Sequence, residues 1–402
     1  MTAQTAANLT KKRKKISKNT PDAILIAIIL IIVGFGIIMV YSASFYYATV
    51  RGNAPSAFAM KQLVIGLVGI VVMLWVTFKF NYRIFSNMIL ASSIYIISLI
   101  LSVSVMFIGQ TVNGATRWID LGFTRFQPSE IAKIGVVIML SAYIIKHRKE
   151  MNKFKYIARA WGIVLLPTGI VAIENLSSAI VVFFIGIMII FITSSKIWYY
   201  VVFALIGVGL AVGVYSLAMT TEPGQELTTP IVKDILKSYR LDRIRVWKDP
   251  WLDPKDKGYQ PIQSLYAVGS GGIFGVGLGK GIQKQGFLPE PHNDIIFAVI
   301  CEELGLIGAV TLLLGYTILV IRGLVIAVRA SDYFGTLVAV GISTMVGIQV
   351  LINVAVNTNT IPTTGMQLPL VSYGGTALAV LLGTLGLLLN ISTTSNIQKV
   401  NK

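Results

Sequence analysis

Long runs of apolar residues, separated by shorter polar segments, dominate the chain from about residue 23 onward. A helix needs about 20 consecutive apolar residues to cross the hydrocarbon core of a bilayer. Ten runs of suitable length can be drawn, at 23–44, 60–78, 86–108, 131–146, 158–174, 177–193, 198–219, 296–321, 333–353 and 375–391. The pattern therefore predicts an all-α integral membrane protein of about ten transmembrane helices.

One long non-apolar stretch, residues 220–293, interrupts this series between the seventh and eighth predicted helices. We predict that it forms a large extracytoplasmic loop. The full predicted organisation is a cytoplasmic basic tail (1–22), helices 1–7 (23–219), the loop (220–293), helices 8–10 (294–391) and a cytoplasmic tail (392–402).

Composition agrees with a chain solvated by lipid. Charged residues make up 13% of the sequence and hydrophobic residues 55%, whereas a soluble domain carries about 25% charged residues. The net charge of +17 would suit nucleic acid, but the placement of the basic residues follows the positive-inside rule instead. With a cytoplasmic N-terminus, nineteen Lys and Arg residues fall in cytoplasmic segments, and the short outer segments hold five: Arg51, Lys61, Arg117, Arg125 and Lys133. Both termini are therefore predicted to be cytoplasmic, and nucleic acid is excluded as a partner.

The basic run from Lys11 to Lys18 has three interpretations: a nucleic-acid arm, a lipid-attracting tail and a topology signal. We favour the topology signal, because the run directly precedes the first predicted span. Cys301 is the sole cysteine, so no intrachain disulfide can form. The two histidines, His147 and His292, are predicted on opposite sides of the membrane, so no zinc site can be assembled.

Acidic residues cluster where the eighth helix is expected to begin. Asp294 could simply cap that helix, since Asn and Asp are preferred N-cap residues. Alternatively, Asp294 and Glu302 lie on one helical face, with Glu302 about 12 Å deeper, and line one cavity. Glu302 and Glu303 inside an apolar helix require a polar cavity or cationic partners, because a buried unpaired charge is costly.

Two neighbouring segments offer cations for that cavity. Arg117 and Trp118 present a guanidinium and a flat ring, which suits a sugar diphosphate. Pro128 is expected at the first position of the fourth helix, with Gln127 as its cap. Glu130 and Lys133 are then i, i+3 neighbours, and they form either a surface ion pair or part of the site.

Three further segments have both structural and functional interpretations. The run 239–248 (YRLDRIRVWK) places Arg240 and Arg243 on one face of a solvated helix, an interfacial helix or an anion-guiding helix. The Gly-rich run 269–281 matches neither of the two nucleotide-binding motifs that are rich in glycine. It forms either a series of tight turns or a loop whose backbone N–H groups and Lys280 approach an anionic head group. The Pro- and Gly-broken segment 361–376 forms a re-entrant loop over the cavity or a surface turn.

At these residues the chain resembles the SEDS family (shape, elongation, division and sporulation proteins), and most closely its division branch. The resemblance spans nearly the whole membrane region. It is carried by the segments 41–44 (YSAS), 113–118 (NGATRW), 127–130 (QPSE) with Lys133, 271–275 (GGIFG), 277–280 (GLGK), 283–284 (QK), 288–294 (LPEPHND), 302–305 (EELG) and 368–375 (LPLVSYGG). One departure is the segment 174–178 (ENLSS), where the family often has Pro-Asp-Leu, so no role is transferred to an acid there.

The resemblance implies a peptidoglycan glycosyltransferase that polymerises lipid II at the outer face of the bacterial cytoplasmic membrane. It also implies a class B penicillin-binding protein and other divisome membrane proteins as partners. Asp294 is the expected catalytic base, and a divalent cation (Mg²⁺ or Mn²⁺) could assist. The expected substrate-binding residues are Arg117, Trp118, Glu130, Lys133, Arg240, Arg243, Lys280, His292, Glu302, Glu303 and Ser372. The rival hypotheses are a lipid II flippase, an elongation-type polymerase and a non-catalytic division scaffold.

Overall fold

The computed structural model describes residues 20–112, 115–120, 125–194 and 238–394, together with positions 122, 198, 209, 212–216 and 219. Within these residues, nine helices are long and apolar enough to cross a membrane, which confirms the all-α multi-pass fold. They are α2 (Ala23–Val50), α3 (Ala57–Lys79), α4 (Met88–Ile108), α5 (Pro128–Lys146), α6 (Phe154–Glu174), α7 (Leu176–Thr193), α12 (Ile296–Arg329), α13 (Tyr333–Asn357) and α14 (Thr376–Thr394). The further span predicted at 198–219, like the basic run at 11–18, falls largely or wholly outside the described residues.

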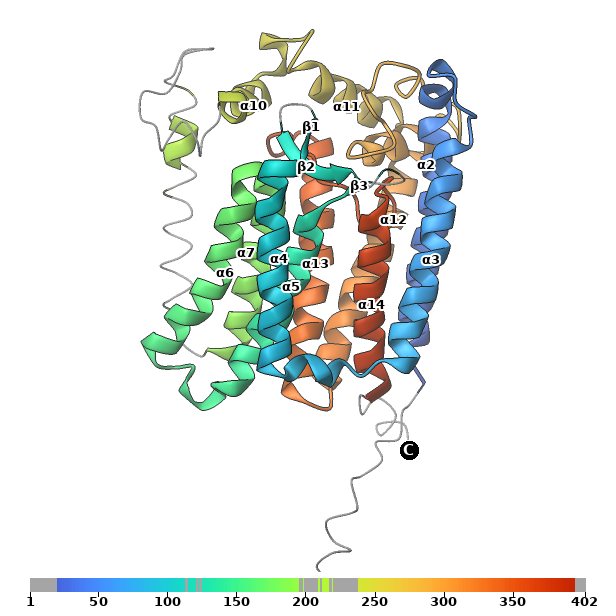
Figure 1. Ribbon diagram of the computed structural model, residues 1–402. Helices are drawn as coiled ribbons and strands as arrows, with labels where there is room; N and C mark the ends of the chain where they lie inside the picture. The colour runs from blue at the N-terminus through green and yellow to red at the C-terminus, as the bar shows by residue number, and fades with distance from the viewer. Residues whose placement is uncertain are drawn as a thin grey trace, which may run out of the picture.

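The long helices run side by side as a bundle, with the small sheet, α10 and α11 at one end (Figure 1). Helices α5, α13 and α14 are the most deeply buried of the nine. Small residues allow close approach at several crossings, as at Gly135 against Ser98 and Gly341 against Val137. Such contacts are how membrane helices pack, because burial away from lipid supplies little driving force.

Polar contacts mark two levels of the bundle. At the level where α2 begins, Asp22 pairs with the Arg322 guanidinium of α12. A second polar contact lies about 20 residues away on each helix, after Asp22 in α2 and before Arg322 in α12. There the Ser42 hydroxyl donates to the Glu303 carboxylate, with O–O distances of 2.7 and 2.8 Å. Twenty helical residues span about 30 Å, the thickness of a hydrocarbon core. The two polar layers are therefore spaced as the two boundaries of a bilayer core.

The remaining short elements divide between the two ends of the bundle. One end carries η1 (Tyr82–Ser86) and η2 (Arg148–Glu150), and this is the end where the described C-terminus lies. The opposite end carries the sheet of β1 to β3, α10 (Ser238–Lys248), η3 (Pro250–Leu252) and α11 (Tyr259–Ser270) (Figure 1). Segments predicted to be cytoplasmic thus lie at one end, and the predicted outer segments lie at the other.

A small antiparallel sheet follows α4, and the sequence pattern did not predict it. Its strands are β1 (Gln110–Val112), β2 (Ala115–Asp120) and β3 (Arg125–Phe126), in the order β1-β2-β3. Trp118 pairs with Gln110, and Ile119 pairs with Phe126. Because side chains alternate along a strand, the sheet directs Arg117 and Trp118 to opposite faces.

The segment between α13 and α14 re-enters the bundle. The Leu370 backbone lies so close to Gly36, midway along α2, that a Cβ there would be 2.7 Å from the Leu370 carbonyl oxygen. The Tyr316 hydroxyl of α12 donates to the Pro369 carbonyl, and Gln62 Nε2 donates to the Ser372 carbonyl at 3.0 Å. These contacts with three helices support a re-entrant loop rather than a surface turn, since buried irregular backbone is satisfied by its neighbours.

Candidate functional site

A cavity of about 410 Å³ lies at the end of the bundle that carries the sheet. Aromatic, cationic and acidic side chains share its wall. The lining residues are Tyr47, Arg51, Phe58, Lys61, Trp118, Asp120, Gly122, Arg125, Glu290, His292, Asn293, Gln367, Tyr373, Gly374 and Gly375. The mixture of flat rings and charges fits a polar ligand with sugar-like faces and negative charge.

His292 forms the aromatic part of this wall. Its ring centroid lies 4.5 Å from that of Phe58, 5.0 Å from that of Tyr47 and 5.5 Å from that of Tyr373. Burial, together with the positive charge of Arg51, lowers the pKa of His292 to about 4. The imidazole is therefore neutral near pH 7 and acts as a ring and hydrogen-bonding group rather than as a cation.

Three cations line the cavity, and each comes from a different element. Arg51 follows α2 and stacks over the Tyr47 ring at 4.2 Å, Lys61 lies in α3, and Arg125 begins β3. All three are among the five outer basic residues of the sequence, but no motif assigned them to the site. The scarcity of outer cations was the signal that could have identified them.

Asp294 lies immediately before α12 and does not cap it. The N-cap position is Ile295, and the helix has no side-chain cap bond. Instead, Asn357 Oδ1 of α13 accepts from the Ala298 N–H at 3.1 Å. The Nδ2 groups of Asn353 and Asn357 donate to the Asp294 carbonyl at 2.8 and 3.0 Å. The N-cap interpretation is therefore wrong, and α13 holds the backbone of Asp294 through its carbonyl.

The Asp294 side chain is half-buried and approaches Arg117 across Gly365. A Cβ built on Gly365 would lie 2.5 Å from the Arg117 guanidinium and 3.7 Å from Asp294 Oδ2, so only glycine leaves room for both groups. Burial raises the pKa of Asp294 to about 6; Glu290 adds to the rise, and Arg117 and Arg243 oppose it. A carboxylate with such a pKa suits proton transfer near neutral pH.

The structure separates Arg117 from Trp118, which the sequence analysis had expected to act side by side. Trp118 lines the large cavity, whereas Arg117 lines a small pocket with Ser129 and Asn175 and reaches Gly365. The reason is the alternation of side chains along β2. Both residues still lie near the segment that carries Asp294, but on different faces of the sheet.

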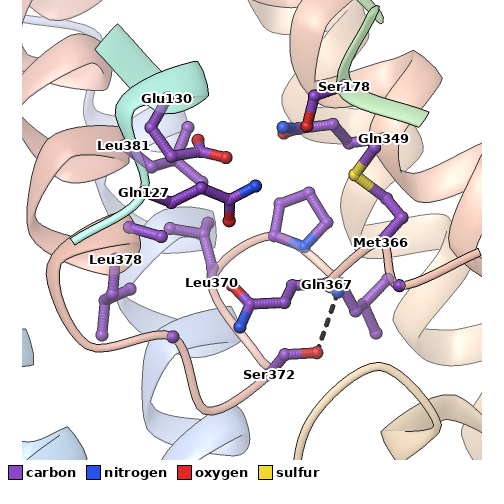
Figure 2. A pocket seen from close by; sticks show the side chains of 15 residues that line it. Gln127, Glu130, Ser178, Gln349, Met366, Gln367, Leu370, Ser372, Leu378 and Leu381 are labelled. Carbon is purple, nitrogen blue, oxygen red and sulfur yellow. Dashed lines mark hydrogen bonds between the residues drawn. The ribbon is translucent and has the colours of Figure 1, made fainter. Parts of the chain in front are cut away.

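Glu130 and Lys133 form the expected i, i+3 pair in the first turns of α5. Pro128 occupies the first helical position, and Gln127 precedes it without a side-chain cap bond. Lys133 Nζ lies 2.8 Å from Glu130 Oε1, and the exposed fractions of the two side chains are 0% and 15%. Figure 2 shows Glu130 and Gln127 beside a small pocket that the re-entrant segment also lines. The pair is thus an internal one and not the surface ion pair that one interpretation proposed.

Replacing Lys133 by methionine is expected to lower the free energy of unfolding by about 1–3 kcal/mol, because Glu130 loses its partner while it retains some contact with solvent. The double variant Lys133→Met/Glu130→Gln should recover most of that loss. Thermal unfolding of both purified variants measures the effect. A double variant that is stable but inactive would show that the Lys133 charge acts on the substrate. Recovered activity would show that the charge is needed only for folding.

Glu302 and Glu303 bind the chain's own Gly-rich hairpin, defined here as residues 271–283. Glu302 Oε1 accepts from the N–H groups of Ile282 and Gln283 at 2.7 and 3.1 Å, and Glu303 Oε2 accepts from Gly279 at 3.1 Å. The expectation that Asp294 and Glu302 share one helical face and one cavity is wrong, because Asp294 precedes α12.

Glu303 pairs with a lysine that was not among the predicted site residues. Lys284 Nζ lies 2.5 Å from Glu303 Oε1 and donates to Ser42 at 2.7 Å, with both charged side chains almost fully buried. The expected cationic partner of the buried acids therefore exists, but it lies in the loop before α12. Lys280 is exposed, and its N–H donates to the Gly277 carbonyl within the hairpin.

The other predicted binding residues support the backbone around the site. Ser372 Oγ accepts from the Leu368 N–H at 2.8 Å and donates to the Asn293 carbonyl at 2.7 Å (the former bond is dashed in Figure 2). Arg243 Nη1 donates to the Thr363 carbonyl at 3.2 Å. The Arg240 side chain lies outside the described residues, although its backbone belongs to α10.

Helix α10 is attached to the re-entrant region through a tryptophan. Trp247 Nε1 donates to the Asn359 carbonyl at 2.9 Å, which holds α10 against the segment that follows α13. Trp247 and Arg243 of α10 each donate a hydrogen bond to the segment after α13, and Arg243 contributes positive charge near Asp294.

Comparison with known proteins gives one consistent family. The family model for cell cycle proteins of the FtsW, RodA and SpoVE type matches residues 22–397. The chain is 37% identical to stage V sporulation protein E of Bacillus subtilis (strain 168), over 94% of this chain and 98% of that protein. It is 35% identical to a probable peptidoglycan glycosyltransferase FtsW of Geobacter sp. (strain M18), over 92% of this chain and 96% of that protein.

Solved structures agree with the sequence matches. A chain of a peptidoglycan synthase complex, solved in work on the structural coordination of polymerization and crosslinking, aligns with a TM-score of 0.72 at 28% identity, over 92% of this chain and 97% of that one. The rod shape determining protein RodA of Thermus thermophilus aligns with a TM-score of 0.63 at 25% identity, over 94% and 98%. The chain therefore belongs to the FtsW, RodA and SpoVE family of cell cycle proteins, the SEDS family that its motifs resemble.

Proposed function

We propose that this protein is a peptidoglycan glycosyltransferase that polymerises lipid II at the outer face of the bacterial cytoplasmic membrane. Family membership and the FtsW relatives support this activity. The observation that carries the proposal is the position of Asp294, a half-buried carboxylate with a raised pKa, directly after the residues Glu290, His292 and Asn293 of a cationic cavity.

The proposed role is septal wall synthesis during cell division, with both termini in the cytoplasm. The Gly-Leu-Gly-Lys segment of the hairpin and the Gln283-Lys284 segment at its end support the division branch. The sporulation relative and the RodA structures make an elongation-type or sporulation polymerase the main alternatives. The proposed partners are a class B penicillin-binding protein, as the match to a synthase complex supports, and other divisome membrane proteins.

In the proposed reaction, Asp294 accepts the proton of the 4-hydroxyl of the acceptor sugar. The hydroxyl oxygen attacks the anomeric carbon of the lipid-linked donor, the bond to the diphosphate breaks, and α becomes β. Undecaprenyl diphosphate leaves with the bonding electron pair. A general base typically contributes a factor of about 10² to 10⁴, so charge stabilisation of the leaving group must supply much of the remaining acceleration.

Arg51, Lys61 and Arg125 are the cations that we now assign to the diphosphate. They line the large cavity, whereas Lys133 is fully buried against Glu130. Trp118 and the aromatic residues around His292 would pack against sugar rings, as amphipathic faces do in carbohydrate sites. Arg117 would hold Asp294 in place and limit how far its pKa rises.

The depth of Asp294 also supports a lipid-linked substrate. Ile296, the first residue of α12, lies about 9 Å beyond Glu302 along the helix at 1.5 Å per residue, and Asp294 precedes Ile296. Glu302 and Glu303 mark the outer polar layer, so Asp294 falls in or just outside the head-group region. A diphosphate anchored in the outer leaflet would present its sugars at that level.

A Mg²⁺ or Mn²⁺ ion would need few protein ligands here. In the part of the chain that the structure describes, no group of three or more His, Cys, Asp or Glu side chains could hold a metal by itself. Mg²⁺ commonly uses one or two carboxylates together with substrate phosphates. Glu290 and Asp294 would be those carboxylates, and the ion would supply additional positive charge beside the diphosphate.

The test uses the purified protein with its synthase partner and lipid II in detergent. Glycan polymer formed without any membrane gradient supports the enzyme. Movement of lipid II across vesicle membranes without polymer would favour the flippase hypothesis. The absence of both activities, in a correctly folded complex, would favour a scaffold.

Polymerisation is expected to fall on the acidic side with a midpoint near pH 6. The base must be ionised, and the raised pKa of Asp294, about 6, leaves about one tenth of it ionised at pH 5. The His292 pKa of about 4 keeps that ring neutral across the same range, so it adds nothing to this limb. Initial rates between pH 5 and 8 measure the profile, and a flat profile down to pH 5 would contradict a base with this pKa.

Neutralising the cavity cations one at a time is expected to lower kcat/KM for lipid II by about 10-fold or more. A hydrogen bond to a charged group is worth about 1.5–3 kcal/mol, and 1.4 kcal/mol is tenfold. The variants are Arg51→Gln, Lys61→Gln and Arg125→Gln, with the exposed Lys255→Gln as the matched control. Equal activity in all four variants would show that the cavity does not bind the diphosphate.

A further inference from the structure

The Gly-rich hairpin carries exposed apolar side chains in close succession. Ile273, Phe274, Leu278 and Ile282 have exposed fractions of 60%, 79%, 52% and 61%. Single exposed apolar residues are ordinary, but a cluster of this kind marks an interaction surface. This surface takes no part in the cavity or in the proposed chemistry.

The backbone of the hairpin replaces the hydrogen bonds that α12 loses at a break. Gly305 has φ 65°, outside the helical region. The freed N–H groups of Leu306 and Ile307 donate to the Gly272 and Ile273 carbonyls at 2.9 and 3.2 Å, and the Glu302 and Glu303 carbonyls accept from Val276 and Gly277 at 3.0 and 2.9 Å. Irregular backbone is tolerated at membrane depth when its polar groups are satisfied in this way.

The hairpin lies at the level of the outer polar layer. It contacts α12 from Glu302 to Ile307, and Glu303 is the residue that bonds Ser42 in that layer. At the end of this contact and in the next turn, α12 exposes the side chains of Leu306, Ile307 and Val310, with fractions of 59%, 51% and 44%, as a lipid-facing helix does. Because Leu306 and Ile307 bond Gly272 and Ile273, the exposed apolar side chains of the hairpin adjoin this exposed apolar stretch of α12.

We propose that the Gly-rich hairpin is inserted into the outer leaflet and that its occupant is lipid. Ile273, Phe274, Leu278 and Ile282 contact acyl chains near the head-group boundary. The exposed Lys280, between them, extends its ammonium to lipid phosphates, as long cationic side chains do at interfaces. Residues 271–283 are therefore a membrane-embedded part of the segment that the sequence pattern assigns to the extracytoplasmic loop.

The test measures depth with nitroxide spin labels on the full chain in nanodiscs of phosphatidylethanolamine and phosphatidylglycerol. Labels are attached to Phe274→Cys and Leu278→Cys, in the presence of the buried Cys301. Val310→Cys serves as the lipid-facing reference, and Leu252→Cys, which is 70% exposed in η3, serves as the matched apolar reference predicted to face water. The unsubstituted chain controls for labelling of Cys301.

Collision rates with oxygen, which concentrates in lipid, and with a water-soluble nickel complex distinguish the outcomes. Positions 274 and 278 should show an oxygen-to-nickel ratio several-fold above that of position 252 and close to that of position 310. A ratio equal to that of position 252 would overturn the proposal and show that the hairpin faces water. Low collision rates with both reagents would overturn it in favour of a second protein surface covering the hairpin.

Discussion

Asp294→Asn is expected to abolish most polymerisation while leaving the fold and lipid II binding intact. Asparagine preserves the size of the side chain but cannot accept the proton, and loss of a general base costs a factor of about 10² to 10⁴. The backbone of this residue is held through its carbonyl by Asn353 and Asn357, and that contact does not depend on the side chain. Unfolding temperature and lipid II affinity should therefore stay close to those of the native chain.

The matched control is Asp256→Asn, an exposed carboxylate in the loop before α11. It should polymerise lipid II at the native rate. If Asp294 only capped α12, asparagine would replace it without loss, because Asn and Asp cap helices about equally well. Asp294 does not cap α12, so unchanged turnover in Asp294→Asn would not have that explanation. It would instead transfer the catalytic role to an acid that lines the cavity, with Glu290 the next to test.

Lys284→Met is expected to lower the free energy of unfolding by about 3–5 kcal/mol, the cost of leaving a buried charge without its partner. Glu303 has no exposed side-chain surface, and Lys284 is its ion-pair partner at 2.5 Å. The loss should exceed that of Lys133→Met, because Glu130 keeps some contact with solvent. Thermal unfolding in detergent, followed by fluorescence, measures both.

Two companion variants make this result specific. The double variant Lys284→Met/Glu303→Gln removes both charges and should recover most of the stability, since replacing a buried pair is far cheaper than breaking it. Lys280→Met changes an exposed lysine within the hairpin, four residues before Lys284, and should leave stability unchanged. Equal losses for positions 280 and 284 would show that the hairpin does not depend on the buried pair.

Several features follow from local sequence alone. The long apolar runs predicted the nine described spans, and Pro128 marks the first residue of α5, where its missing N–H has no helical partner to lose. The Glu130–Lys133 pair follows from i, i+3 spacing. Each of these depends on residues within one helix turn or one continuous segment, so periodicity and composition contain the information.

The composition of the site was decided by tertiary structure, because its parts come from segments far apart in the chain. Arg51, Lys61 and Arg125 meet at one cavity only after α2, α3 and the sheet pack together. The same packing gives Glu303 its partner Lys284, and α13 supplies the amide groups that hold the Asp294 backbone. Local periodicity predicted that Asp294 and Glu302 share a face, but Asp294 lies outside α12 and the hairpin binds Glu302. Helical spacing applies only within a helix, and the pairing of charges depends on which distant segments fold against each other.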